Sequence, residues 1–285
     1  MNLALAALFA GATCIALSPI WVRVSDVGPT ASAFWRVALA VPLLWILFAA
    51  SRKGSPPASA PHRGYLLAAG VAFAGDLAFW HWSIQYTSVA NSTLLANLAT
   101  IFVTLAAWLL WKQRPTRLFL AGLATALVGV GMLVRTSLSF SATALLGDAL
   151  GVVTAMFYAW YLLSVKEVRD RGAATLQLMA VTTTITALLL APVALVSGEA
   201  MLPASLNGWL VLLGLAWISH SAGQGLIAYA LAHLPAAFSS VSLLFQPVMA
   251  AVFAWALLGE PLVALQVAGG AVVLCGIWLA RRGSA

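Results

Sequence analysis

The chain has 285 residues, of which 63% are hydrophobic and 7% are charged, and its formal net charge is +7. Soluble domains carry roughly 25% charged residues, so this composition excludes a water-soluble globular protein. The 14 Lys and Arg lie almost entirely between long apolar stretches. The positive charge therefore does not indicate nucleic-acid binding, and we expect membrane lipid to be its partner.

Ten apolar stretches follow one another, each close to the ~20 residues that cross a bilayer as a helix. In chain order the predicted spans cover residues 3–23, 30–50, 64–86, 90–111, 117–135, 147–165, 173–196, 207–231, 235–258 and 262–280. The longest gap, 51–63, is rich in Pro, Ser and Ala and is expected to be a flexible loop. The sequence thus predicts an all-α integral membrane protein without a soluble domain.

Basic residues are concentrated in every second gap. Those that face one side are Arg52, Lys53, Arg63, Lys112, Arg114, Arg117, Lys166, Arg169, Arg171, Arg281 and Arg282. The gaps on the other side hold Arg23 and Arg135, and only Arg36 lies well inside a span. By the positive-inside rule, we expect a multi-pass protein of a bacterial-type cytoplasmic (inner) membrane, with the N- and C-termini in the cytoplasm.

Weak internal similarity indicates two copies of one five-span unit. Shifts of 146 and 147 residues align Pro115 with Pro261, Gly122 with Gly269, and Gly129 with Gly276. We therefore divide the chain into residues 1–140 and 141–285. Because five is odd, the second copy must enter the membrane from the opposite side, so the halves are related by inversion. Inverted repeats are typical of alternating-access transporters, whose substrate site lies near the midplane.

Three motifs carry a family resemblance: Phe34-Trp35-Arg36, the turn Leu258-Gly259-Glu260-Pro261, and the series Gln266, Gly269 and Gly276. The chain resembles the drug/metabolite transporter superfamily of the EamA type, although Lys112-Gln113-Arg114-Pro115 in the first copy lacks the Gly-Glu. The resemblance implies an exporter with ten transmembrane helices, arranged as two inverted five-helix repeats around a central cavity. General similarity is greatest to exporters of aromatic and neutral amino acids.

Ionisable groups inside a bilayer are costly and usually functional. Arg36 and Asp76 are predicted to lie at similar depth, and their partners in the repeat are Ala180 and Ala222, so the symmetry of the fold does not require this charge. In one interpretation the two side chains form a structural ion pair. In the other they bind the carboxylate and the ammonium group of a zwitterion, and Asp76 also exchanges protons that couple transport to a gradient.

Aromatic residues near these charges are further candidates for binding substrate. Phe79 and Trp80 follow Asp76 at helical spacing, and Trp160 and Trp217 lie near mid-depth, so we expect them to line the cavity. The alternative is that such residues belong to interfacial belts. His81 is also included, although a hydrogen-bonded structural histidine is the competing interpretation.

Buried amides and prolines complete the candidate site. Asn97 and Gln246 lie nearest to mid-depth on the fourth and ninth spans, which are equivalent in the two copies, and a buried amide in lipid needs a partner. Helix-to-helix hydrogen bonding is the alternative role. Pro19, Pro42 and Pro247 interrupt spans 1, 2 and 9 and are candidate hinges for gating, although prolines are also simply frequent in membrane helices.

Two other classes of function fit less well. An enzyme is disfavoured because the chain has no His-Glu-x-x-His or Gly-x-Ser-x-Gly motif, and Asp76 is the only acid deep in a span. A channel is disfavoured because no ring of polar residues recurs. We therefore predict export of a small molecule by alternating access, without cofactor or metal. An amino acid, including aromatic ones, is the leading cargo, and a drug, a nucleoside or another lipophilic metabolite is the alternative.

Overall fold

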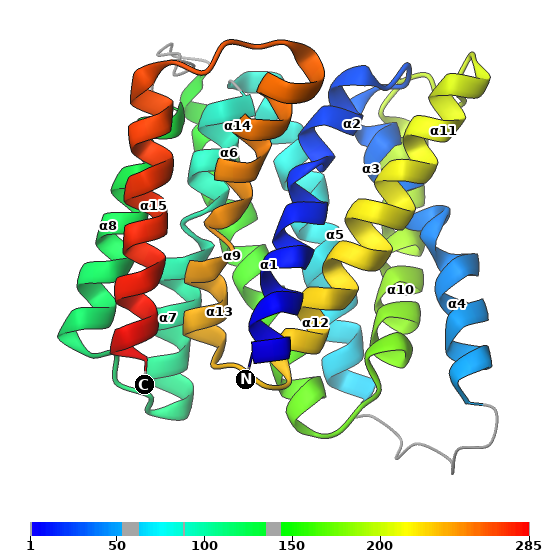
Figure 1. Cartoon of the computed structure of the whole chain (residues 1–285). Helices are drawn as coiled ribbons and strands as arrows, with labels where there is room; N and C mark the ends of the chain where they lie inside the picture. Colours follow the sequence, from blue (N-terminus) through cyan, green and yellow to red (C-terminus); the bar gives the residue numbers. More distant parts are fainter. Residues whose placement is uncertain (1, 53–62, 88, 135–143, 285) are drawn as a thin grey trace.

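The computed structural model describes residues 2–52, 63–87, 89–134 and 144–284. These residues form a bundle of helices, and no strand occurs among them (Figure 1). Several membrane spans consist of two or three consecutive helices. In chain order the helices are α1 (Asn2–Ala16), α2 (Ser18–Val24), α3 (Pro29–Ala38), α4 (Ala40–Ser51), α5 (Arg63–Tyr86), α6 (Val89–Ala96), α7 (Ala99–Trp111), α8 (Arg117–Val134), α9 (Ala144–Asp170), α10 (Thr175–Val196), α11 (Leu206–Gly214), the π-helix η2 (Leu215–Gln224), α12 (Gly225–Leu231), α13 (Ala236–Ser242), α14 (Phe245–Leu258) and α15 (Ala264–Gly283).

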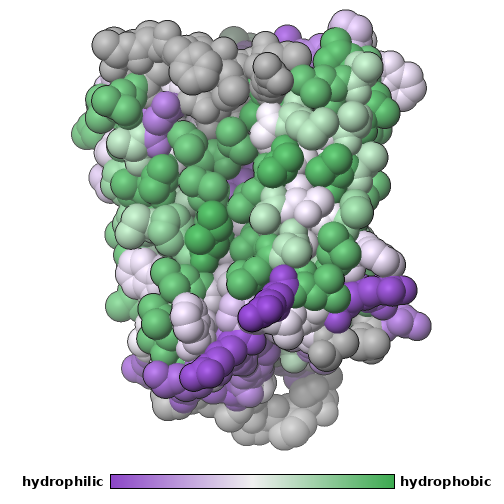
Figure 2. All heavy atoms as spheres, turned by 90° about the vertical axis from the view of Figure 1, so that its left-hand side faces the viewer, coloured by the Kyte–Doolittle hydropathy of each residue, from purple (hydrophilic) through white to green (hydrophobic). Residues whose placement is uncertain are grey.

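The ten predicted spans agree with these helices to within a few residues. Nine segments of the described chain are long and apolar enough to cross a membrane. The tenth, α5, has 24 residues but is more polar because it carries Asp76 and His81. Hydrophobic side chains cover the middle of the face shown in Figure 2, and hydrophilic ones gather at its lower rim. The prediction of an all-helical integral membrane protein is confirmed.

The largest difference is at the end of the sixth span, which continues to Asp170 rather than ending at residue 165. Two ion pairs explain the added turn, because charges four residues apart on a helix face attract each other. Lys166 Nζ lies 2.5 Å from Asp170 Oδ1, and Arg171 donates to Glu167 at 2.5 and 2.9 Å. The predicted boundary between residues 140 and 141, together with Arg135 and most of the 51–63 loop, lies outside the described residues.

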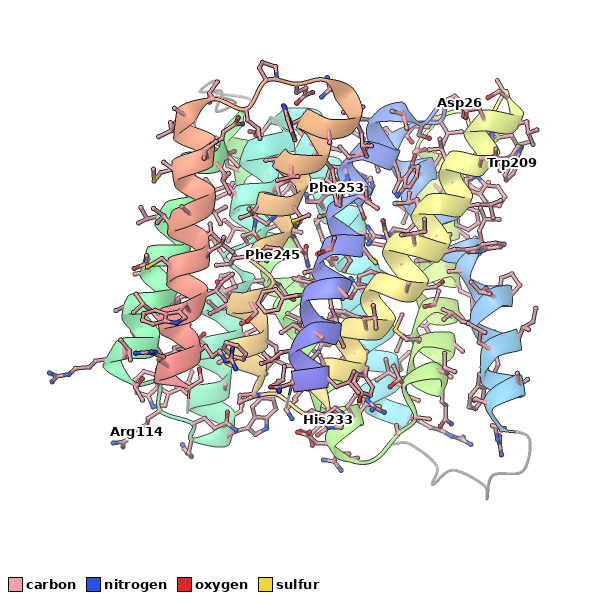
Figure 3. All side chains as sticks on the ribbon, viewed as in Figure 1. Asp26, Arg114, Trp209, His233, Phe245 and Phe253 are labelled. Carbon is pink, nitrogen blue, oxygen red and sulfur yellow. The ribbon has the colours of Figure 1, made fainter. Side chains whose placement is uncertain are left out.

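The two halves of the bundle, α1 to α8 and α9 to α15, run in opposite directions. α1 begins and α15 ends at the same end of the molecule, here called the terminal end (Figure 1). α9 ends there as well, since Lys166 and Asp170 of α9 and Gly283 of α15 border one cavity at this end. The first helix of the second half therefore starts at the opposite, distal end. Asp26 and Trp209 mark the distal end, and Arg114 and His233 the terminal end (Figure 3).

Close packing of α8 on α15 joins the halves at one side of the bundle. Gly122 lies against Gly276, and Gly129 lies against Gly269, so closely that an added β-carbon would come within 2.7 Å of the facing carbonyl oxygen. These contacts are reciprocal, because the repeat aligns Gly122 with Gly269 and Gly129 with Gly276. Glycine is needed here because the backbones approach too closely for a side chain. α8 and α15 therefore act as a scaffold, as their small residues suggest.

Four spans are interrupted near mid-depth. The interruptions at Leu17, at Leu39 and at Leu243 lie two to four residues before Pro19, Pro42 and Pro247, in keeping with the loss of a backbone donor at proline. The fourth, at Asn97 and Leu98, has no proline. The repeat shift of 146 aligns it with the interruption of the ninth span.

Side chains explain the paired interruptions in spans 4 and 9. Asn97 Nδ2 donates to Thr93 O at 2.8 Å, and Ser242 Oγ donates to Phe238 O at 2.9 Å, so each competes for a backbone acceptor four residues earlier. The next turns tighten to bonds between residues three apart, including Leu98 N to Leu95 O at 3.0 Å. Both spans thus change pitch at equivalent depths.

The glycine packing predicts a position-specific loss of stability. In Gly129→Ala the new methyl group meets the backbone of α15, and overpacking of this kind costs ~1–3 kcal/mol. Gly131→Ala is the matched control on the same helix, because a β-carbon at Gly131 meets nothing within 4 Å. The apparent melting temperature of the purified protein in detergent should fall for the first variant and stay level or rise for the second. Equal melting temperatures would contradict the packing role.

Candidate functional site

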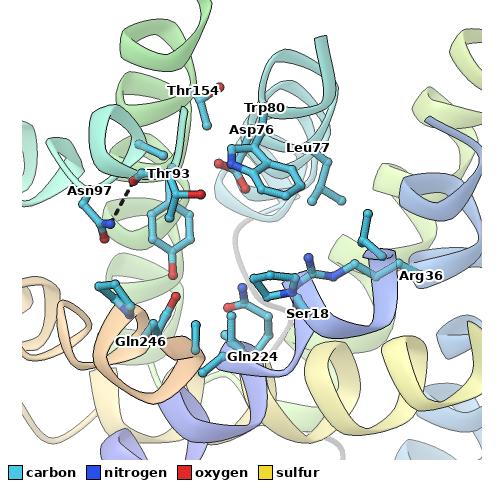
Figure 4. A pocket seen from close by; sticks show the side chains of 18 of the residues that line it. Ser18, Arg36, Asp76, Leu77, Trp80, Thr93, Asn97, Thr154, Gln224 and Gln246 are labelled. Carbon is cyan, nitrogen blue, oxygen red and sulfur yellow. Dashed lines mark hydrogen bonds between the residues drawn. The ribbon is translucent and has the colours of Figure 1, made fainter. Parts of the chain in front are cut away.

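A cavity lies between mid-depth and the distal end of the bundle, and it encloses about 860 Å³ of space, part of it open to the outside. The side chains that line it come from spans 1, 2, 3, 4, 6, 8 and 9 (Figure 4). No described residue of α8 or α15 contributes to its walls. Toward the terminal end the space is closed by packing, including Phe9 against Phe245 with ring centroids 5.3 Å apart.

The first half supplies the charges of the cavity, Arg36 from α3 and Asp76 from α5. Arg36 is 8% exposed, and its guanidinium carbon lies 6.0 Å from the centre of the Phe73 ring. The ion pairs found among the described residues do not include one between Arg36 and Asp76. The carboxylate of Asp76 is partly exposed in the cavity wall. The two opposite charges therefore border one space without neutralising each other directly.

The second half supplies neutral polar groups. Tyr158 on α9, Gln224 at the end of η2 and Gln246 on α14 line the opposite wall, and the Tyr158 hydroxyl lies close to both glutamine side chains. Asn97, from the interrupted fourth span, lies nearby, and its Nδ2 donates a hydrogen bond to Thr93 O. The cavity is thus chemically asymmetric, with charge on one wall and amides and a phenol on the other.

Several buried polar atoms in these walls lack a hydrogen-bond partner. They are Ser18 Oγ, Arg36 Nε, Gln224 Oε1 and Gln246 Nε2. A buried polar group without a partner costs roughly 1–3 kcal/mol. Such groups are rare in native proteins and call for an explanation. Because these atoms converge on one cavity, water or a polar ligand that offers both donors and acceptors can pair with them there.

Five of the predicted site residues line this cavity: Arg36, Asp76, Trp80, Asn97 and Gln246. Two of the three predicted hinge prolines, Pro19 and Pro247, also border it, whereas Pro42 does not.

Trp160 and Trp217 were predicted to line the cavity, but they are not part of its wall. Both lie on the outer surface of the bundle, where 43% and 46% of each residue is exposed. Trp217 Nε1 donates to Leu39 O at 3.2 Å, which explains its depth without a role in the cavity. The depth of an aromatic residue does not reveal its face, because a ring suits lipid as well as a cavity.

Phe79 and His81 are also not part of the cavity wall. Phe79 stacks on Phe157 with ring centroids 5.3 Å apart. His81 is 2% exposed, and its Nδ1 donates to Leu77 O at 2.6 Å, which matches the structural alternative. The corresponding predictions for the site are therefore corrected.

Sequence reasoning missed Tyr158, Phe73, Thr93, Thr154 and Ser18 in the cavity wall. Tyr158 lies on the same apolar stretch as Trp160, and nothing in the pattern ranks one above the other. Gln224 is also in the wall and is not among the predicted site residues. The side of the eighth span on which it lies depends on the π-helix η2, which changes the register of that span.

A second cavity lies at the terminal end, with about 1710 Å³ of empty space that is partly open to the outside. It is bordered by α7, α9 and α13, which belong to spans that also line the distal cavity. Along span 4, Asn97 borders the distal cavity and Thr104 the terminal one, ~10 Å apart at 1.5 Å per residue. The packed residues between the two cavities form a barrier. Leu162 and Leu244, which are buried, lie at the depth of this barrier.

Comparisons with known proteins agree with this arrangement. The model of the EamA-like transporter family matches residues 2–135 and 145–282. An "Uncharacterized transporter" of Archaeoglobus fulgidus is 28% identical over 91% of this chain and 90% of its own length. The pseudopaline exporter CntI of Pseudomonas aeruginosa is 26% identical over 85% of this chain and 82% of its own length. A solved crystal structure matches the fold with a TM-score of 0.85 at 15% identity, covering 99% of this chain and 98% of that one.

The two cavities predict opposite patterns of thiol labelling along the ninth span. Ala250 borders the distal cavity and Ala237 the terminal one. In a background without Cys14 and Cys275, Ala250→Cys should react with a membrane-impermeant maleimide applied from the side opposite the termini. Ala237→Cys should react only from the side of the termini. Labelling of both cysteines from one side would contradict this arrangement.

Proposed function

The chain belongs to the EamA-like transporter family, and we propose that it is an inner-membrane exporter of small zwitterionic metabolites, with amino acids as its main cargo. The observation that carries the proposal is the pair Arg36 and Asp76, which border one cavity without forming an ion pair. A zwitterion satisfies both charges at once, with its carboxylate at the guanidinium and its ammonium group at the carboxylate. Trp80, an aromatic residue of the wall, can contact an apolar side chain.

Export, rather than uptake, is supported by similarity to the pseudopaline exporter CntI. The basic residues support an orientation. Those at the terminal end include Arg114 and Lys166, while Arg23 lies at the end of α2 on the distal side. With basic residues on the cytoplasmic side, both chain ends lie in the cytoplasm and the distal cavity faces outward.

Alternating access is supported by the two cavities and the barrier between them. Spans 4, 6 and 9 reach both cavities, and spans 4 and 9 are interrupted where the barrier begins. A change of angle at these interruptions would open the terminal cavity toward the site while the distal side closes. The terminal cavity then receives cargo from the cytoplasm.

A lipophilic drug or a nucleoside is the second candidate cargo. The specific observation in its favour is the aromatic part of the wall, where Phe73, Trp80 and Tyr158 present rings to the cavity. Such cargo would use stacking rather than the two charges, so its transport would depend little on Asp76.

Removing the charge of Asp76 separates these candidates. Asp76→Asn should keep the melting temperature and lower transport of neutral amino acids into liposomes at least ~10-fold, since a hydrogen bond to a charged group contributes ~1.5–3 kcal/mol. Glu260→Gln removes an acid from an exposed pair with Arg23 and should change transport less than ~2-fold. The same assay with and without a pH gradient tests whether Asp76 carries protons. Unchanged amino-acid transport by the folded Asp76→Asn protein would remove the proposal.

A further inference from the structure

Building on the proposed function, we infer that Gln224 and Gln246 form a subsite for a carboxamide, so that the preferred cargo is a zwitterion whose side chain ends in an amide. This specificity would come from the second half of the protein. The charged head of the cargo binds Arg36 and Asp76 in the first half.

The unpaired atoms of the two glutamines are complementary to an amide. Gln224 Oε1 is a buried acceptor and Gln246 Nε2 a buried donor, and neither has a partner. A primary carboxamide offers one carbonyl acceptor and two N–H donors. The final torsion of a glutamine side chain is broad, so both amides can turn toward cargo without changing the backbone. One amide of the cargo can therefore form hydrogen bonds with both unpaired atoms, Gln224 Oε1 and Gln246 Nε2.

Tyr158 lies beside the two glutamines. Its hydroxyl is close to both side chains, and the three residues come from α9, η2 and α14. Gln224 is 2% exposed, so its amide is confined among the helices rather than free in a wide space. The surrounding helices therefore set the position of the amide, while its final torsion can still adjust to a ligand.

Charge in the cavity favours an amide over a second carboxylate. Of the described residues in the wall, Arg36 is the only one with a positive charge. In the proposed complex its guanidinium pairs with the α-carboxylate of the cargo. An acidic side chain would place another negative charge in the same space as Asp76, without a cation to balance it. Glutamine and asparagine should therefore bind better than glutamate and aspartate.

A purely structural role is the competing explanation, in which the amides and Tyr158 tie three spans together. This role leaves one atom of each amide unpaired, so it does not account for them. It also makes a different prediction, since loss of a structural tie lowers the affinity for all cargo equally.

The test is ligand-induced thermal stabilisation of the full-length protein in detergent, titrated with L-glutamine, L-methionine and L-glutamate. Methionine has a side chain of similar length without the amide. Glutamine should bind about 10-fold more tightly than methionine, as expected from two hydrogen bonds. In Gln224→Met, and separately in Gln246→Met, this ratio should fall to within ~2-fold, while the affinity for methionine changes less than ~2-fold. Two variants are used so that one that fails to fold does not end the test.

The matched control is Gln177→Met, because Gln177 Oε1 is also buried and unpaired but lies on α10, outside the cavity wall. It should keep the wild-type ratio. Equal binding of glutamine and methionine by the wild type overturns the subsite while amino-acid transport stands. Equal loss of all ligands in the glutamine variants overturns it too, in favour of the structural tie. If no amino acid binds at all, the proposed function fails together with the subsite.

Discussion

The pairing of backbone polar groups inside the bilayer is the constraint on which the cavity depends. Lipid offers no hydrogen bonds, so every interruption of a span must find partners within the bundle. The π-helix η2 supplies two of them. Ser219 Oγ donates to Cys14 O at 2.8 Å, near the interruption of span 1, and Trp217 Nε1 donates to Leu39 O at the interruption of span 2. Interrupted helices can thus border a polar space without exposing their backbones to lipid.

Carboxylates tie the distal ends of the two halves together. Glu199 accepts from Thr30 Oγ1 and Ala31 N at 2.8 and 2.9 Å, at the start of α3. Asp26 accepts from Ser205 Oγ at 3.1 Å, at the start of α11. Each acid lies at a helix N-terminus, where unpaired donors and the helix dipole favour negative charge. The distal ends of spans 2 and 8 are therefore fixed, whereas spans 4 and 9 carry the paired interruptions.

Much of this architecture follows from the sequence, because the length and spacing of apolar stretches determine the spans, and an odd number of spans in each copy requires inversion. The charged part of the site was also predictable, since Arg36 and Asp76 are costly in lipid wherever they point. The neutral part was not. The side of the helix on which Trp217 and Gln224 lie depends on the register of η2. No rule of composition distinguishes Tyr158, which lines the cavity, from Trp160, which lies on the outer surface.

The asymmetry of the site has a physical reason within a symmetric scaffold. If the second half repeated Arg36 and Asp76 in place of Ala180 and Ala222, four charges instead of two would lie within the membrane spans. Each buried charge carries a desolvation cost of several kcal/mol. Neutral amides and a phenol let the second half contribute hydrogen bonds at lower cost. The inverted repeat therefore comes with a cavity at each end of the bundle, while the departure from symmetry confines the charges of the distal cavity to residues of the first half.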